Sequence, residues 1–146
     1  DRSSAASDVY KRQLQLIADG KNQKAINILK KADVEIPAYN VTLDYMSGGL
    51  DMARGWLLTG QKAKGKEYVE AVWKNAYQYL NYYLSLTNDR FLQSQNDCIR
   101  QIMIMQSVCD VAGMVSPQLQ KSYEKQLNAL YTLYRGRGGS MPQGNQ

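Results

Sequence analysis

Apolar residues recur along the chain at helical spacing. Between residues 22 and 33 they are separated by three, one and three positions, at Ala25, Ile28, Leu29 and Ala32, which is the period of an amphipathic helix. The same pattern predicts further helices over 8–18, 42–59, 61–85, 88–112 and 117–135. Alternating apolar and polar runs typical of strands do not occur in the sequence, so the pattern predicts an all-α fold of about six helices.

Helix-breaking residues separate these segments at short intervals. Gly20, Pro37, Gly60 and Gly113 are expected to end helices, and Ser116 followed by proline is a typical start signal. Short connections make consecutive helices antiparallel hairpins. We therefore predict a disordered start over 1–7, a single helical-repeat domain over 8–135 and a flexible tail over 136–146, where small and polar residues dominate.

Two of the predicted helices carry unusually broad apolar patterns. In the helix over 61–85, one stripe consists of Val69, Val72, Trp73, Ala76, Leu80 and Tyr83. A second stripe consists of Tyr68, Tyr79, Tyr82 and Leu86. A helix that is apolar on two sides is expected to be packed on two sides. The helix over 88–112 has apolar residues spaced by sevens, with others between them: Phe91, Cys98, Ile102, Met105, Cys109 and Ala112. In a compact bundle this seam predicts core packing.

Composition excludes several kinds of chemistry. The chain has 146 residues, 44% of them hydrophobic and 21% charged, as in one soluble globular domain. It has no histidine, so it cannot build histidine metal sites, serine–histidine triads or cysteine–histidine dyads. Cys98 and Cys109 lie eleven residues apart in one predicted helix, about 16 Å along its axis, too far for a disulfide. We predict no catalytic residue, no metal site and no cofactor.

Charge gives little support for a nucleic-acid or membrane partner. The net charge is +5, from 18 basic and 13 acidic residues. Up to Gly60 the basic and acidic residues number eight and seven, and after it ten and six. Lys62, Lys64 and Lys66 alternate, and only the first and last of them share a helix face, which indicates a solvated face. No apolar run reaches the roughly 18 residues of a membrane span, so we expect no nucleic acid and no membrane insertion.

The two glycines that end the first and third helices lie forty residues apart, at Gly20 and Gly60. Helical-hairpin repeats have periods of roughly 34 to 47 residues. After Gly20, a small residue follows at five (Ala25), an apolar one at nine (Leu29), alanine at twelve and Pro37 at seventeen. This series resembles the second half of a tetratricopeptide repeat.

A second, looser unit follows over residues 45–72. Ala53 and Trp56 fit the small and aromatic positions of its first helix, and Gly65 and Val69 fit its second helix. The closing proline is missing, and the second helix continues past its normal end. We therefore expect a tetratricopeptide-like right-handed stack, finished by a long hairpin.

Four segments together resemble a known family. They are Ile-Pro-Ala-Tyr-Asn at 36–40, Leu-Asp-Tyr-Met at 43–46, Gly-Gln-Lys-Ala-Lys-Gly at 60–65 and Leu-Asn-Tyr-Tyr-Leu-Ser-Leu at 80–86. In this order they are similar to the C-terminal soluble region of large Gram-negative membrane proteins described as protein-O-mannosyltransferase-like, otherwise of unknown function. The resemblance covers about residues 9–113, and the Tyr-Tyr-Leu-Ser-Leu run is its most specific part.

The resemblance implies a fragment of a larger protein. Members of the family look like multi-span glycosyltransferases followed by an extramembrane helical-repeat region. The chain would then lie on the periplasmic side of a bacterial membrane, attached through an N-terminal membrane region. It would be cytoplasmic if the resemblance is wrong. The acidic catalytic residue of such transferases lies in the membrane part, so no catalytic residue is carried over to this chain.

Three functional hypotheses follow. The first is a non-catalytic interaction module that binds a protein or a domain of its parent chain, because repeat stacks expose one helix of each unit along a continuous surface. Polar and aromatic residues of the first and third helices are the candidate contacts: Lys11, Gln15, Tyr39, Asp44 and Asp51. The alternative for each is ordinary solvated surface.

The second hypothesis is recognition of a glycan or a glycosylated acceptor. Tyrosine and tryptophan faces stack on sugars, and Tyr77, Asn81 and Tyr82 could supply rings and an amide. Their helical spacing also fits plain core packing, so solvent exposure of the tyrosines distinguishes the two.

The third hypothesis is an enzyme that uses paired carboxylates. Asp44 and Asp51 are seven residues apart, about 10 Å along a helix. That separation exceeds the spacing of a retaining glycosidase pair and lies at the edge of the inverting range. Such pairs arise by chance on most helices, and we expect no intrinsic catalysis.

The proposed register makes a stability prediction at Trp56. Its ring should fill the interface of the second hairpin, and truncation of a buried tryptophan costs about 3–5 kcal/mol. Trp56→Ala is therefore expected to unfold the domain in a thermal melt followed by circular dichroism. An unchanged melting temperature would contradict the register.

Overall fold

A computed structural model describes residues 11–35 and 48–140, and every regular element in these ranges is a helix. Residues 11–18 are helical, and six further helices follow: α2 (Asn22–Glu35), α3 (Gly49–Leu58), α4 (Lys62–Leu84), α5 (Asn88–Gln93), α6 (Gln95–Val115) and α7 (Pro117–Gly136). The all-α prediction is confirmed for the part of the chain described.

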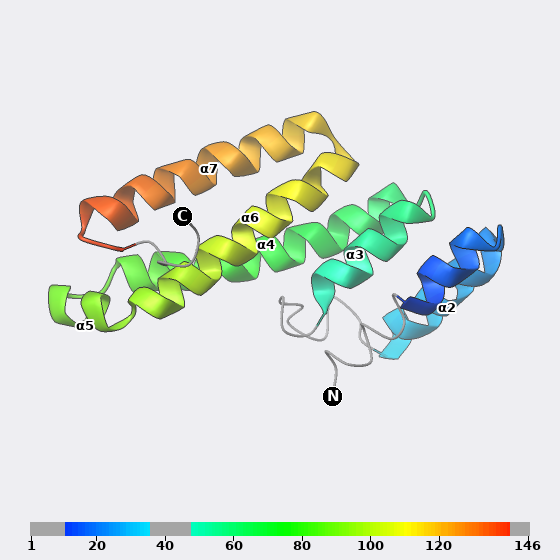
Figure 1. Cartoon of the computed structure of the whole chain (residues 1–146), viewed down its shortest axis with the longest axis horizontal. Helices are drawn as coiled ribbons and strands as arrows, with labels where there is room; N and C mark the ends of the chain where they lie inside the picture. Colours follow the sequence, from blue (N-terminus) through cyan, green and yellow to red (C-terminus); the bar gives the residue numbers. More distant parts are fainter. Residues whose placement is uncertain (1–10, 36–47, 141–146) are drawn as a thin grey trace.

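The long helix α4 is the central helix of the fold, because it packs against both α3 and α6. The largest interhelical interfaces join α3 to α4, α4 to α6 and α6 to α7, and Figure 1 shows these helices side by side. The hairpin of residues 11–18 and α2 lies beside α3 at the other end of the molecule. In Figure 1, α3 covers the first part of α4, while the second part of α4 extends beyond it toward α5.

The turns that close the first two hairpins have the same hydrogen bonds. Gly20 N donates to the carbonyl of Ile17 at 3.0 Å, and Gly60 N donates to that of Leu57 at 3.1 Å. The next residue in each turn then donates to the carbonyl four positions before the glycine, at 2.8 and 2.9 Å. Both glycines have positive φ, 73° and 83°, which favours glycine at a helix end. The forty-residue spacing therefore corresponds to two equivalent turns.

A buried glutamine joins the first hairpin to α3. Gln13 is fully buried, and its Nε2 donates to the carbonyl of Gly55. A Cβ at Gly55 would collide with the Gln13 side chain, so the missing side chain makes this contact possible. The polar Gln13 thus takes a buried position on this helix, while the neighbouring apolar Leu14 is 40% exposed.

The third predicted helix begins later than expected within the described residues. The prediction spanned 42–59, of which 42–47 lie outside the described residues. Helix α3 begins at Gly49, because Gly48 has φ 80°, in the left-handed region that a helix interior does not contain. Trp56 is buried on this helix, with 3% of its surface exposed, as the stability prediction requires.

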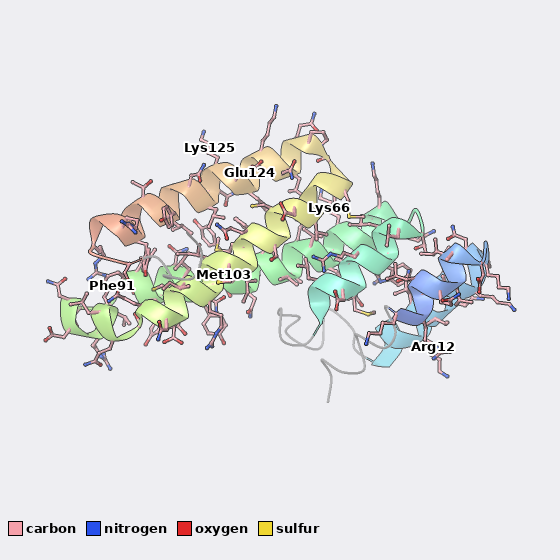
Figure 2. All side chains as sticks on the ribbon, viewed as in Figure 1. Arg12, Lys66, Phe91, Met103, Glu124 and Lys125 are labelled. Atoms are coloured by element: carbon pink, nitrogen blue, oxygen red, sulfur yellow. The ribbon has the colours of Figure 1, made fainter. Side chains whose placement is uncertain are left out.

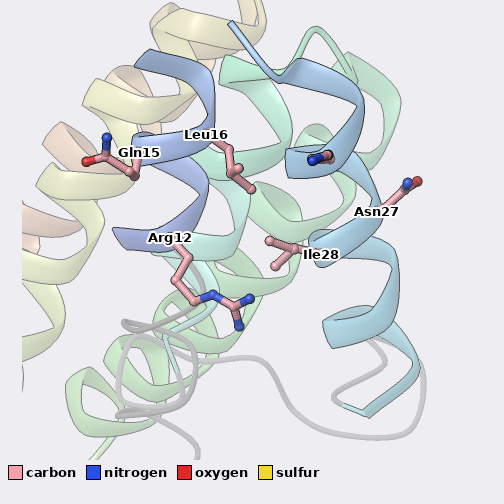
Figure 3. Close-up of a pocket in the computed structure, with 6 residues that line it drawn as sticks. Arg12, Gln15, Leu16, Asn27 and Ile28 are labelled. Carbon is pink, nitrogen blue, oxygen red and sulfur yellow. The ribbon is translucent and has the colours of Figure 1, made fainter. Parts of the chain in front are cut away.

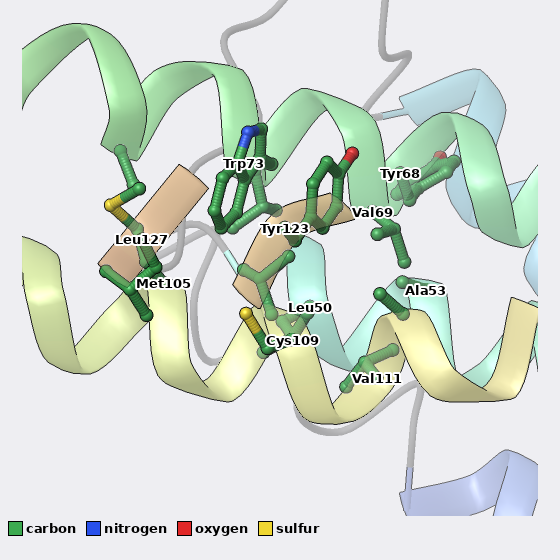
Figure 4. Close-up of a cluster of buried hydrophobic side chains, with 14 of the residues drawn as sticks. Leu50, Ala53, Tyr68, Val69, Trp73, Met105, Cys109, Val111, Tyr123 and Leu127 are labelled. Atoms are coloured by element: carbon green, nitrogen blue, oxygen red, sulfur yellow. The ribbon is translucent and has the colours of Figure 1, made fainter. Parts of the chain in front are cut away.

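The core is one cluster of buried side chains that runs from α2 and α3 through α4 to α6 and α7. The rings of Trp73 and Tyr123 stack with centroids 4.0 Å apart and an interplanar angle of 7°, and Figure 4 shows them among aliphatic side chains and Cys109. The seam predicted from seven-residue spacing is confirmed, because all six of its residues are at least nine-tenths buried: Phe91, Cys98, Ile102, Met105, Cys109 and Ala112. Both cysteines are free thiols, as their predicted separation requires.

The fifth predicted helix is divided into α5 and α6 by Ser94. The Ser94 hydroxyl donates to the carbonyl of Phe91 at 2.8 Å, and Ser94 N donates to the same carbonyl at 2.9 Å. Serine competes in this way with regular helical bonding, and it lets Phe91 enter the core while the chain changes direction. The prediction of one continuous helix over 88–112 was therefore wrong at this point.

Gly113 does not end this helix, which continues to Val115. A Cβ at Gly113 would lie 2.8 Å from the amide of Gln120 on α7, and Gln120 Nε2 donates to the carbonyl of Cys109 at 3.1 Å. The glycine therefore permits close packing of α7. The predicted cap is confirmed, since Ser116 Oγ accepts a hydrogen bond from Leu119 N at 3.1 Å.

Residues 137–140 are folded back onto the corner between α4 and α6, although the sequence predicted a flexible tail from residue 136. The Arg137 guanidinium donates to the carbonyl of Leu84 at 2.6 Å and to Asn88 Oδ1 at 3.1 Å. It also lies 4.3 Å from the centre of the Phe91 ring. Tyr134 Oη donates to the carbonyl of Ser140 at 2.6 Å. Arg137 therefore joins the end of α7 to the end of α4 and to two residues of α5.

We predict that Arg137→Ala lowers the free energy of unfolding by about 1.5–3 kcal/mol, because it removes charge-assisted hydrogen bonds and a cation–π contact. Urea denaturation measures the change. Arg135→Ala is the matched control, since Arg135 is exposed in the last turn of the same helix and should change stability little. Equal effects of the two substitutions would contradict the role given to Arg137.

Candidate functional site

The residues predicted to contact a protein partner are distributed over two elements. Lys11 and Gln15 are exposed on the helix over 11–18, and Gln15 Nε2 donates to Asp19 Oδ1 at 3.2 Å. Asp51, on α3, accepts a hydrogen bond from Arg54 at 3.0 Å. Two further predicted contacts, Tyr39 and Asp44, lie outside the described residues. The predicted carboxylate pair of Asp44 and Asp51 is therefore described only at Asp51.

The three residues predicted to contact a glycan do not form one platform. Tyr77 is partly buried against the core and lies beside Trp73, with ring centroids 6.2 Å apart. Asn81 Nδ2 donates to the carbonyl of Tyr77 at 3.2 Å. Tyr82 is 58% exposed and pairs instead with Tyr83. Residues five positions apart in a helix differ by about 140° in direction, so Tyr77 and Tyr82 lie on different faces.

A cluster of tyrosines does form on the second half of α4. The rings of Tyr79 and Tyr83 stack with centroids 6.4 Å apart, and the Tyr82 ring meets Tyr83 edge-on at 5.6 Å. Tyr79 is 47% exposed, whereas Tyr68, near the start of the same helix, is fully buried. The predicted second packed stripe of this helix was therefore wrong at Tyr79 and Tyr82, which lie on the part of α4 that extends beyond α3 (Figure 1), whereas Leu86 at its end is packed partly against the core.

A groove of about 610 Å³ runs along the exposed face of α6. Its described lining, which we call the α6 groove, consists of Asn96, Ile99, Arg100, Met103, Ile104, Gln106, Ser107 and Asp110. Ile99 and Ile104 are packed partly into the core, and Met103 is 47% exposed. Figure 2 shows Met103 on α6 near the middle of the molecule. The groove thus has an apolar middle and polar ends.

The tyrosine cluster borders the α6 groove. The pKa of Tyr83 is raised above its usual value, first by burial and then by the nearby carboxylate of Asp97 and the Tyr79 phenol, while Arg100 lowers it. Both Asp97 and Arg100 belong to α6, so the cluster and this helix form one continuous surface. The sequence alone does not reveal this surface, because the spacing of four between Tyr79 and Tyr83 is visible in it but the exposure of the cluster is not.

A second groove, of about 510 Å³, lies on the first hairpin. Figure 3 shows it between the helix over 11–18 and α2. We call it the hairpin groove, and its described lining is Arg12, Gln15, Leu16, Lys24, Asn27 and Ile28. It contains one predicted site residue, Gln15, and it combines apolar and basic side chains.

Neither metal-binding groups nor activated thiols occur in the described parts of the chain. No group of three or more carboxylate or cysteine side chains there could hold a metal ion. Burial raises the pKa of the Cys109 thiol from 9.0 to about 11, with a further contribution from Glu124 and Asp110. Burial also raises the pKa of Cys98. Both thiols therefore stay protonated near neutral pH, which is the opposite of what a nucleophile requires.

Helix α6 is, among the described helices, the one long and apolar enough to cross a membrane by length and composition alone. A core helix passes the same test, and here eight of its residues are buried in interfaces with α4 and α7.

No protein-family model, curated protein or solved structure is significantly similar to this chain. The resemblance to the protein-O-mannosyltransferase-like family therefore stays a prediction from sequence.

The cysteine environment makes a testable prediction. Because the folded-state pKa of Cys109 is raised, the stability that its neutral thiol contributes is full below about pH 9 and is lost as the pH rises toward about 11. We expect the free energy of unfolding to fall over this range, and to fall less steeply in Cys109→Ala. Parallel pH profiles for the two proteins, measured by urea denaturation, would contradict the assignment.

Proposed function

We propose that this domain is a non-catalytic helical-repeat interaction domain that binds a protein segment across the α6 groove and the tyrosine cluster. The observation that carries the proposal is the exposure of Met103, Tyr79 and Tyr82 beside a groove with an apolar middle. Contiguous exposed apolar surface rimmed by polar residues is typical of interaction sites. Methionine adapts its shape to different apolar partners.

A peptide fits this surface better than a small substrate does. Ile99, Met103 and Ile104 can contact apolar side chains of a ligand, while Arg100 and Asp110 offer opposite charges to its flanks. Aromatic and methionine side chains are enriched at protein interfaces. The described residues contribute no activated nucleophile and no metal-binding group to this groove.

A tetratricopeptide-like right-handed stack is the architecture we propose for this function. Its support is the pair of equivalent turns forty residues apart and the small residues Ala25 and Gly65, both buried five positions after the two turn glycines. The third hairpin, α6 with α7, differs in length from the first two, as the last unit of a stack often does.

The sequence resemblance supports a further proposal about the parent protein. We propose that the domain is the extramembrane C-terminal part of a multi-span glycosyltransferase-like membrane protein and lies on the periplasmic side of a bacterial membrane. A free-standing tetratricopeptide-like adaptor is the alternative when the resemblance is set aside. The binding surface proposed above serves either case.

Glycan recognition is the second candidate function, and one observation favours it. Tyr79 and Tyr82 are about half exposed and present ring faces or edges to solvent. The amide of Asn81 is engaged within its own helix, but Asn96 lines the adjoining groove. An exposed ring with a nearby amide is what sugar binding requires.

A phage-displayed library of random peptides and a glycan array test the two functions on the same protein. We predict that the library yields peptides with apolar anchors, and that Met103→Lys weakens their binding at least about tenfold, as loss of an interface anchor does. Met114→Lys is the matched control, because Met114 is exposed on the same helix outside the groove and should leave binding unchanged.

Circular dichroism checks that both variants stay folded. Failure to select any peptide, or equal binding by the Met103 and Met114 variants, would contradict the proposed function. Selective binding of a glycan that is lost in Tyr82→Ala would replace it with the second candidate.

A further inference from the structure

We propose that the hairpin groove binds an acidic peptide segment that carries apolar side chains between its carboxylates. This surface lies on the first hairpin and shares no residue with the α6 groove. The inference therefore adds a second binding site, and it does not depend on the proposed function of the first.

The positive charge of the chain is concentrated in this hairpin. Residues 11–31 contain six of the 18 basic residues and only one of the 13 acidic residues, Asp19. The segment alone has a formal charge of +5, and the rest of the chain is balanced. Two acidic residues, Asp33 and Glu35, follow in the last turn of α2, so the excess belongs to the helix over 11–18 and the first turns of α2.

The basic side chains are available to a ligand. All six are exposed: Lys11, Arg12, Lys21, Lys24, Lys30 and Lys31. The ion pairs between described residues join Arg54 to Asp51 and Lys64 to Glu67, and none of them involves this hairpin. Charges that lack a partner in the described structure raise the local concentration of anions and speed their association.

The hairpin groove places these charges around an apolar floor. Leu16 and Ile28 are half-buried and come from the two facing helices. Figure 3 shows the side chains of Arg12 and Ile28 extending into the space between the helices. Lys24 lines the groove, and Lys31, seven residues later, shares its helix face. A ligand in this groove would therefore contact the apolar side chains of Leu16 and Ile28 between the positive charges of Arg12 and Lys24.

Two amide side chains flank the groove. Asn27 Oδ1 accepts from Gln23 Nε2 at 3.2 Å, and Gln15 Nε2 donates to Asp19 Oδ1 at 3.2 Å. In Figure 3 both amide side chains point away from the space between the two helices. They therefore lie at the outer edges of the groove, where the ends of a bound peptide would pass.

An acidic peptide fits this surface better than other polyanions do. Single-stranded nucleic acid binds where bases stack on aromatic rings, and none of the six described lining residues is aromatic. A membrane surface favours protruding apolar side chains, whereas Leu16 and Ile28 line a recess. Carboxylates beside leucine-type side chains match both the rim and the floor.

Fluorescence anisotropy with the full chain tests the inference. The probe is a fluorescein-labelled synthetic peptide in which glutamates flank two leucines one helical turn apart. We expect saturable binding that weakens at high ionic strength. Arg12→Glu combined with Lys24→Glu should weaken it at least about tenfold. The pair Arg12→Gln with Lys24→Gln removes the two charges without reversing them, and it should also weaken binding. This second variant tests the inference if the charge reversal disturbs folding.

The matched control is Lys121→Glu combined with Lys125→Glu, which changes the net charge equally on exposed positions of α7. Figure 2 shows Lys125 on α7, away from Arg12. Retained binding in this control, together with weaker binding of a peptide whose leucines are replaced by serine, supports the inference. No binding, equal loss in the control, or equal competition by a short RNA or by phosphatidylserine vesicles would overturn it.

Discussion

The unequal length of α3 and α4 is the constraint on which the rest of the structure depends. Helix α4 has 23 residues and α3 has ten, so one side of α4 has a covering partner only near its start (Figure 1). Along this side of α4, Tyr68 is buried near the start of the helix, whereas Tyr79 and Tyr82 are exposed on the part that extends beyond α3. Helix α6 covers another side of α4, and its own outer face carries the α6 groove beside the uncovered tyrosines.

The two ends of the molecule differ in the contacts that join their helices. Helices α4, α6 and α7 share an apolar core with stacked rings and a closing contact from Arg137. The first hairpin meets α3 through Gln13, and it contributes Ile26 and Leu29 to the same core cluster. Among the described atoms, Gln13 Oε1 is buried at this contact without a hydrogen-bond partner, and a buried polar atom without a partner costs free energy.

Periodicity alone was enough to predict the helices, the hairpin turns and the core seam of α6, because these follow from local spacing. The start of α3 at Gly49, the break at Ser94 and the folding back of Arg137 depend on contacts between distant parts of the chain, which spacing does not contain. The exposed tyrosines were misassigned for the same reason. The excess of basic residues in the first hairpin can be counted in the sequence. It does not show in the total for residues 1–60, because acidic residues outside the hairpin balance it there.

Hydroxyl-radical footprinting of the tyrosines, followed by mass spectrometry, tests most directly whether the second half of α4 is uncovered. We expect rapid oxidation of Tyr79 and Tyr82, which are about half exposed, and protection of Tyr68 and Tyr134, which are fully buried. Urea-unfolded protein, in which all four tyrosines should react, gives the reference rates. Protection of Tyr79 and Tyr82 to the level of Tyr68 would show that the second half of α4 is covered, and the surface beside the α6 groove would then be part of the core.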